Sequence, residues 1–146
     1  MKTKIKKVAI KLIGMTALIV LSSFTGDGTK TENSWKAPNE ANELVNPMNG
    51  NVTASLEGKK IFNQMCSVCH GEKGKGDGIA GAGLTPHPAN FTSETICSET
   101  DGAIFWKMTT GKAPMASYKT ILTEEKRWQL VTYIRQLQAN SKPKIN

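Results

Sequence analysis

Cysteine and histidine are scarce in this 146-residue sequence, which contains three cysteines and two histidines. Three cysteines cannot all pair within one chain, and they are too few for the dense frameworks of small disulfide-bonded secreted domains. A structural zinc site needs four ligands at finger or ribbon spacing. Apart from Cys66, Cys69 and His70, only His87 and Cys97 remain, and their positions do not match such a spacing. The scarcity argues against a disulfide scaffold and against a zinc finger.

The sequence also lacks a convincing pair of β-strands, an internal repeat and a basic stripe with interleaved aromatic residues. A thioredoxin-type Cys-x-x-Cys pair needs a βαβ context, so a thiol redox enzyme is disfavoured. The formal charge of +7 is concentrated at the start, because the first 26 residues hold five of the 19 basic side chains and none of the 12 acidic ones. The remainder carries 14 basic and 12 acidic side chains. We therefore expect no binding to nucleic acid.

The basic start leads into an apolar run from Leu12 to Phe24, which is shorter than the roughly 20 residues that cross a bilayer. A charged segment before a short apolar run is typical of a secretory signal peptide, which we place at residues 1–25. An uncleaved membrane anchor stays open, because the region after the run has no Ala-x-Ala cleavage pattern. In either case we expect the folded part to be exported, to the periplasm or a similar compartment.

Residues 26–52 are rich in Asn, Glu, Gly, Pro and Lys and poor in apolar side chains. Such a segment cannot bury enough apolar surface to fold by itself. We predict a polar linker or docking arm, with Trp35 and Leu44 as side chains that would pin it to the domain. The folded domain is predicted at residues 53–140, followed by a tail at residues 141–146.

The domain is predicted to be all-α and rich in loops. A first helix is expected over residues 55–65, with Ser55 as its N-cap and with Gly58 where another helix can approach closely. A second is expected over residues 99–110, and a third over residues 123–138, which begins at a good N-cap and carries an apolar stripe. The glycines and prolines between these segments predict irregular loops. So small a core would be completed by a large buried cofactor.

The most informative motif is "CSVCH", from Cys66 to His70. Its spacing is that of haem c attachment. Each thiol adds to one vinyl group of the porphyrin, and two intervening residues in a helical turn let both sulfurs reach neighbouring edges of the ring. The histidine that follows is then placed under the iron, where a neutral imidazole nitrogen is an axial ligand. We therefore expect one covalent haem c and its iron, attached through Cys66 and Cys69 and ligated by His70.

A methionine thioether commonly completes the coordination of haem iron in electron carriers. Four of the six methionines lie in the signal, in the linker or directly before the motif. Met108 falls on the apolar face of the second predicted helix, where core packing is the simpler interpretation. Met115 lies in an irregular loop that can fold over the far side of a ring. We predict Met115 as the second axial ligand.

The chain resembles the class I c-type cytochromes. The resemblance rests on "CSVCHGEKGKGDG", "GKAPMASY" and "RWQLVTYIRQL", which lie within residues 55–138. It implies a small monohaem fold in which the N- and C-terminal helices cross near a glycine and aromatic residues, matched here by Gly58, Phe62 and Tyr133. Loops would then enclose the haem.

The resemblance also implies a proline carbonyl that accepts a hydrogen bond from the axial histidine. Pro88 is the candidate for this haem-site residue, with Pro86 as the alternative. One departure concerns the residue after Met115, where many relatives have proline and this chain has Ala116.

A ligand pair of His70 and Met115 leaves no open position on the iron. We therefore expect a one-electron carrier, not an enzyme, in an exported respiratory or dehydrogenase chain. Its redox partners would be a dehydrogenase or quinol-oxidising complex and a terminal oxidase or reductase.

Two alternatives stay open. Without Met115 on the iron, the protein would be a five-coordinate haem protein that binds or reduces a small molecule, and residues 26–52 could instead dock it as a fixed subunit of a larger membrane complex. Membrane contact is expected only if the N-terminal helix is retained.

The remaining candidates are weaker. His87 could be a second histidine ligand, although an exposed loop residue is the simpler interpretation. Cys97 could bind a metal or join another chain, although a lone cysteine is more often a small buried side chain. A group of lysines could surround an exposed haem edge and attract acidic partners, or simply be solvated surface: Lys73, Lys75, Lys112 and Lys119.

Overall fold

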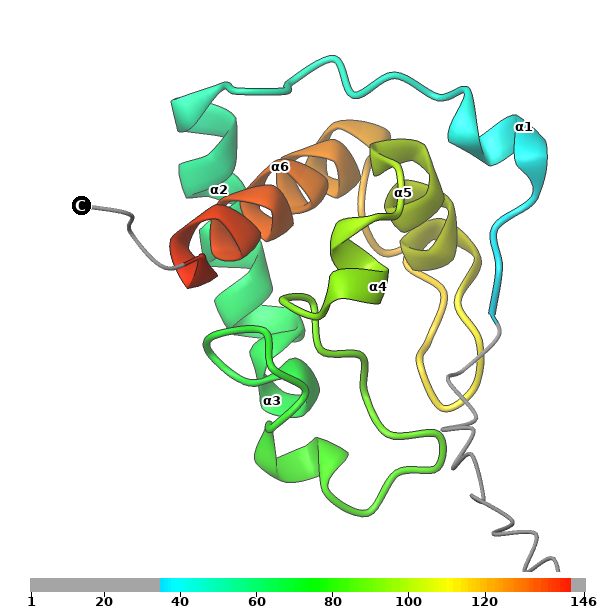
Figure 1. The fold of residues 1–146 in the computed structure, drawn as a ribbon, viewed down its shortest axis with the longest axis vertical. Helices are drawn as coiled ribbons and strands as arrows, with labels where there is room; N and C mark the ends of the chain where they lie inside the picture. The colour runs from blue at the N-terminus through cyan, green and yellow to red at the C-terminus, as the bar shows by residue number, and fades with distance from the viewer. Residues whose placement is uncertain (1–34, 143–146) are drawn as a thin grey trace, which may run out of the picture. The chain divides into compact units, whose positions relative to one another are not determined.

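The computed structural model describes residues 35–142, so the predicted signal peptide, the start of the linker and the end of the tail lie outside the described residues. Within this part the chain forms helices and loops with a single β-bridge and no strand, and the all-α prediction is confirmed (Figure 1). The elements are α1 Asn39–Asn42, α2 Val52–Met65, α3 Ser67–His70, the 3-10 turn η1 Ile79–Gly81, α4 Glu94–Cys97, α5 Asp101–Thr110 and α6 Glu124–Ser141.

Helices α2 and α6 cross at the centre of the domain (Figure 1). The crossing is close because Gly58 of α2 lies directly against the backbone of α6 at Gln129. A side chain on residue 58 would hold the two helices apart. The predicted crossing of the first and last helices at Gly58 is confirmed.

The starts of these helices are set by side-chain caps. Asn51, not Ser55, is the N-cap of α2, and its side chain accepts a hydrogen bond from the Ala54 N–H at 3.0 Å. The predicted cap was wrong because Ser55 is buried and bonds through its hydroxyl to Gln136 of α6. Thr123 caps α6 as predicted, accepting from the backbone of Lys126.

The apolar core lies between α2, α5 and α6. Phe62 is fully buried, and its ring meets Tyr133 edge-on with the ring centres 5.3 Å apart. Phe105 of α5 stacks on Trp128 of α6 at 4.0 Å. Each such side chain contributes about 1.5–3 kcal/mol when fully buried. These contacts join the three helices into a rigid frame for the loops that follow α2 and α5.

Residues 35–51 pack against α5 and α6. The buried Asn46 donates from Nδ2 to Asp101 at 2.8 Å and to Thr132 at 3.2 Å. Gly102 of α5 lets Ala41 approach, since a Cβ there would lie 1.9 Å from the Ala41 carbonyl oxygen. Asparagine-mediated bonds thus hold this polar segment where apolar side chains are few.

Trp35 and Leu44 were predicted to pin the segment. Trp35 lies against Trp106 with ring centres 6.1 Å apart, and the Lys107 ammonium lies 5.8 Å from the Trp35 ring. Leu44 is half exposed and contacts α5 at Gly102. Over residues 35–142, none of the helices has the length and apolar character of a membrane span.

Candidate cofactor site

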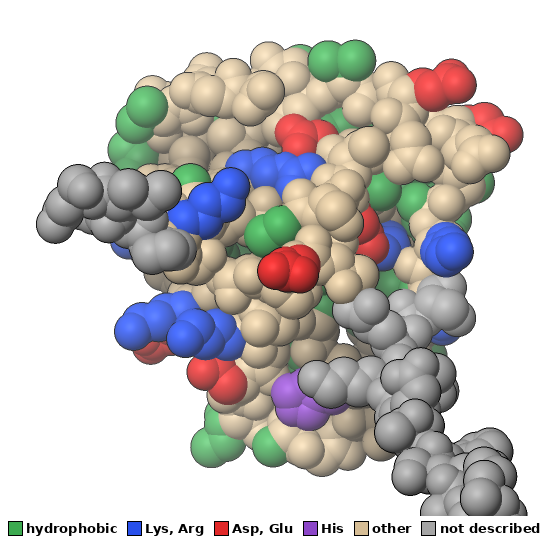
Figure 2. Space-filling model, in the orientation of Figure 1, with side chains coloured by type: hydrophobic (Ala, Val, Ile, Leu, Met, Phe, Trp, Pro, Cys, Tyr) green, Lys and Arg blue, Asp and Glu red, His purple; other side chains and the backbone are tan. Residues whose placement is uncertain are grey.

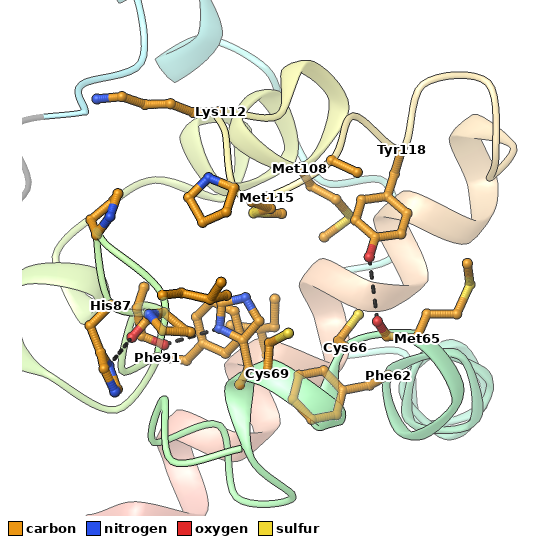
Figure 3. Close-up of a pocket in the computed structure, with 18 of the residues that line it drawn as sticks. Phe62, Met65, Cys66, Cys69, His87, Phe91, Met108, Lys112, Met115 and Tyr118 are labelled. Carbon is orange, nitrogen blue, oxygen red and sulfur yellow. Dashed lines mark hydrogen bonds between the residues drawn. The ribbon is translucent and has the colours of Figure 1, made fainter. Parts of the chain in front are cut away.

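A cavity of about 280 Å³ lies between α2, α6 and the two long loops (Figure 3). All five residues predicted for the site line it: Cys66, Cys69, His70, Pro88 and Met115. Most of the remaining lining is apolar, with Phe62, Leu130 and Ile134 forming its floor toward the core. The fold therefore brings together residues that lie far apart in the sequence.

The two cysteines and the histidine share one short helical turn. The Cys66 N–H donates to the Phe62 carbonyl at 2.8 Å, and the His70 N–H donates to the Cys66 carbonyl at 2.9 Å. Helix α3 therefore continues directly from the end of α2. Figure 3 shows the Cys66 and Cys69 side chains directed into the same cavity. This is the arrangement that two thioether bonds to one ring require.

The glycine-rich loop after the motif folds back onto this turn. The Gly76 N–H donates to the His70 carbonyl at 2.8 Å, and the Gly78 N–H donates to the Cys69 carbonyl at 3.1 Å. Gly76 has a φ of +80°, and a Cβ at Gly78 would lie 2.5 Å from the Val68 carbonyl oxygen. Glycine is needed at both positions, for its backbone conformation at one and for close approach at the other. The loop thereby fixes the backbone that carries the cysteines and the histidine.

The carbonyl that faces His70 belongs to Ala89, at 3.1 Å from Nδ1. The predicted acceptor, Pro88, was wrong by one residue, and its alternative, Pro86, was wrong by three. The Pro88 carbonyl instead packs against Gly76, where a Cβ would lie 2.5 Å away, and lies 3.2 Å from His87 Nδ1. This close contact with the glycine loop turns the Pro88 carbonyl away from His70.

The hydrogen bond to Ala89 also defines the state of the His70 ring. A carbonyl only accepts, so Nδ1 carries the hydrogen and Nε2 keeps a free lone pair. Burial lowers the pKa of His70, while the bond to Ala89 acts in the opposite direction. A neutral imidazole with a free Nε2 is a ready ligand for iron.

Phe91 is a site residue that the sequence interpretation missed. Its ring stacks on His70 with the ring centres 4.4 Å apart and the planes 16° apart. Phe62 of α2 contacts the Phe91 ring in an edge-to-face arrangement, with the ring centres 6.2 Å apart. An aromatic residue within the polar, Pro-rich stretch "TPHPANFTS" was the available signal, since such a residue needs an apolar contact elsewhere.

Two methionines lie across the cavity from the cysteines, Met108 and Met115 (Figure 3). Met108 is buried in α5 as part of the core, whereas Met115 lies in the loop and is only partly buried. The loop is held by a hydrogen bond from the Met115 N–H to the Lys112 carbonyl at 2.9 Å, and Gly111 lets it turn with a φ of +68°. Because Met115 lies in this loop and lines the cavity, its thioether can face a group that is bound there.

Burial also shifts the pKa of two other groups that line the cavity. Burial, and then the neighbouring Cys69, raise the pKa of Cys66 to about 12, so this thiol is protonated before it forms any bond to a cofactor. Burial likewise raises the pKa of Tyr118, whose hydroxyl donates to the Met65 carbonyl at 3.4 Å. In the part of the chain that the structure describes, no three His, Cys, Asp or Glu side chains gather into a metal site of their own.

The weaker candidates lie at the edges of the site. His87 is exposed at the rim of the cavity, together with Lys112, and Trp35 also lines the cavity. Cys97 is partly buried, with Sγ 3.8 Å from the Phe91 carbonyl oxygen. Lys73 is exposed on the glycine loop. On the face shown in Figure 2, basic and acidic side chains lie interspersed.

Comparison with known proteins agrees with this geometry. The family model described as cytochrome c oxidase, cbb3-type, subunit III matches residues 53–134. The comparison with curated proteins finds no match. Among solved structures, a chain of the reducing HAO-like protein complex of Kuenenia stuttgartiensis is similar, with 28% identity and a TM-score of 0.50. The match covers 60% of this chain and 44% of that one, so the chain spans less than half of that relative.

The family match covers more than half of the chain and includes every residue of the cavity that was predicted from the sequence. The apolar walls, the paired thiols and the neutral histidine fit a haem attached through thioether bonds. The chain therefore belongs to the family of the cbb3-type subunit III cytochrome c domain and is a c-type cytochrome that carries covalent haem c with its iron.

Proposed function

We propose that this protein is a one-electron carrier in an exported electron-transfer chain. In this proposal Cys66 and Cys69 hold the haem by thioether bonds, and His70 and Met115 are its axial ligands. The observation that carries the proposal is the meeting of the Cys66–His70 turn and the Met115 loop at one apolar cavity. When bound, the haem supplies one redox centre that gains or loses a single electron.

The chain's own residues prepare this site before any electron moves. Ala89 fixes the tautomer of His70, and Phe91 restrains the plane of its ring. Phe62, Leu130 and Ile134 keep water from the inner side of the cavity. A rigid, water-poor site changes little between the two redox states. It therefore keeps the cost of reorganisation low during transfer.

A methionine ligand and apolar walls both favour the reduced state, because they stabilise the extra positive charge of the oxidised iron poorly. We therefore expect a potential suited to accepting electrons from a dehydrogenase or a quinol-oxidising complex. A terminal oxidase or reductase would then accept these electrons from the carrier. The similar solved chain belongs to a protein complex described as reducing, which supports a partner that is itself a redox protein.

The place of the protein in the cell is part of the same proposal. The basic and apolar start of the sequence supports export, with residues 1–25 as a signal peptide or as a retained anchor. The exposed Lys112 at the rim of the cavity would favour an acidic partner surface, and so would the exposed Lys73 if it lies on the same face. A fixed place as a subunit of a larger complex is the alternative, and co-purification with such a complex would distinguish it from a free carrier.

The first test is the optical spectrum of the oxidised protein matured in a host that attaches haem c. We expect the weak far-red band of sulfur-to-iron charge transfer, lost in Met115→Ala. Met108→Leu is the matched control, because Met108 lines the same cavity and this change nearly conserves volume. A band lost only in the Met108 variant would assign the ligand to Met108. A high-spin parent that binds CO rapidly would overturn the carrier and favour small-molecule chemistry at the iron.

A further inference from the structure

Gln138 near the end of α6 is a buried amide that does not line the cavity. The residue is 5% exposed, and burying an amide costs free energy unless its polar atoms are paired. Nε2 donates to the Phe91 carbonyl at 3.0 Å, and Oε1 accepts from Arg135 Nη1 at 2.9 Å. Both polar ends of the amide are therefore used, one of them on the loop that carries Phe91.

Arg135 is itself held in place. Its Nε donates to Asp101 at 2.6 Å, and its other nitrogens donate to the carbonyls of Glu99 and Cys97. Asp101 also accepts from Asn46 at 2.8 Å. A guanidinium whose planar fork is bonded on several sides cannot rotate freely. Arg135 and Gln138 thus form a fixed bracket from the start of α5 to the Phe91 loop, which we call the Gln138 bracket.

The backbone of Phe91 is secured from both sides. Its N–H donates to the Gly74 carbonyl at 2.7 Å, and its carbonyl accepts from the Gln138 bracket. A Cβ at Gly74 would lie 3.1 Å from the Phe91 ring, so the glycine loop is already in close contact with it. The ring has Phe62 at one edge and His70 stacked on its face. It has little room to shift.

The short segment 89–91 therefore makes two separate contacts with His70. Ala89 accepts from Nδ1, and Phe91 stacks on the ring. Both contacts depend on where this short segment lies, and the Gln138 bracket ties the backbone of the segment to α6 by a hydrogen bond. A change at Gln138 would reach the imidazole through the backbone of the segment, without any contact of its own with the cavity.

We propose that Gln138 is a positioning residue that sets the orientation and basicity of the His70 ligand, and through them the reduction potential. The inference rests on the proposed ligation of iron by His70. A firm hydrogen bond to Nδ1 makes an axial histidine a stronger electron donor, which favours oxidised iron. Loosening the bracket weakens that bond, so the potential rises and the plane of the ring is less well defined.

The test compares the haem-loaded Gln138→Met protein with the parent. The substitution keeps the length of the side chain and removes the donating amide without adding a charge. Phe91→Leu is the second variant, which keeps apolar bulk and removes the flat ring. Ser55→Ala is the matched control, because it removes a buried hydrogen bond, to Gln136, with no link to residues 89–91.

Three quantities are measured: the thermal midpoint, the reduction potential by spectroelectrochemistry, and the hyperfine-shifted haem methyl signals in the proton NMR spectrum of the oxidised protein. The methyl pattern reports the plane of the axial histidine. We expect a higher potential and an altered methyl pattern in Gln138→Met and Phe91→Leu, and neither change in Ser55→Ala.

The proposal is overturned if the two variants lose stability as Ser55→Ala does while their potential and methyl pattern equal those of the parent. Failure of the proposed function would appear in a different measurement, the optical spectrum of the parent protein. A parent spectrum that is not low-spin would contradict ligation of the iron by His70 and Met115, and would therefore overturn this inference as well. The parent spectrum is therefore recorded before the variants are compared.

Discussion

Gly58 and Gln129 meet backbone to backbone: a Cβ on residue 58 would lie 2.0 Å from the Gln129 carbonyl oxygen. Gly58→Ala would gain up to ~1 kcal/mol of helix propensity. The clash outweighs this gain, because two packed helices must separate, at a cost of about 1–3 kcal/mol. We expect the free energy of unfolding of the haem-loaded protein to fall, as measured in denaturant. Gly83→Ala is the control, since nothing lies within 4 Å of its Cβ position. Equal stability of the two variants would contradict the close crossing.

The two cysteines should make separable contributions to haem attachment. Cys66→Ala and Cys69→Ala each leave one thioether, so the haem should stay with the chain on a denaturing gel but show a shifted reduced spectrum. Acidic organic solvent should extract the haem from the double variant, because no thioether bond would hold it. Haem that stays covalent in the double variant would exclude the proposed attachment. Cys97→Ala is the matched control, because Cys97 lies outside the cavity lining, and we expect it to behave as the parent.

Trp35 should shield the site. It lines the cavity while lying against Trp106, so Trp35→Ala admits water. Water stabilises the more highly charged oxidised iron, and we expect the reduction potential to fall. Trp35→Phe keeps an aromatic wall and should stay near the parent value. If both variants match the parent in a potentiometric titration, Trp35 does not shield the haem.

Asn46 should decide whether residues 35–51 stay on the domain. Asn46→Ala leaves an oxygen of the half-buried Asp101 without this partner, and a lost buried hydrogen bond of this kind costs about 1–3 kcal/mol. We expect a lower thermal midpoint together with faster proteolytic cleavage within residues 35–51. The control is Asn49→Ala, at an exposed position of the same segment. Cleavage at the parent rate in Asn46→Ala would mean that other contacts hold the segment.

The sequence predicted best what depends on local chemistry. The cap at Thr123 and the grouping of Cys66, Cys69 and His70 each follow from a few neighbouring residues. The close approach at Gly58 was predicted instead from the family resemblance, since its partner Gln129 lies far along the chain. The start of α2 was misjudged because Asn51 and Ser55 are both good caps. Burial of Ser55 against α6, which is a long-range contact, decides between them.

The loop contacts of His70 could not be predicted in the same way. Whether Pro88 or Ala89 faces the ring depends on a one-residue difference in the path of a loop, and that path is set by contacts with Gly76. The stacking of Phe91 on His70 depends likewise on Gln138, far along the chain. A sequence pattern gives the residues of such a loop but not which of them turns inward.

The position of Trp35 has a consequence for encounters between molecules. Trp35 lies against Trp106 and also forms a wall of the cavity, so the segment before α1 passes beside the proposed haem. A partner protein that bound this segment would be held close to the cavity. Electron exchange with that partner would then depend on a local effective concentration, and not on the amount of protein in the compartment.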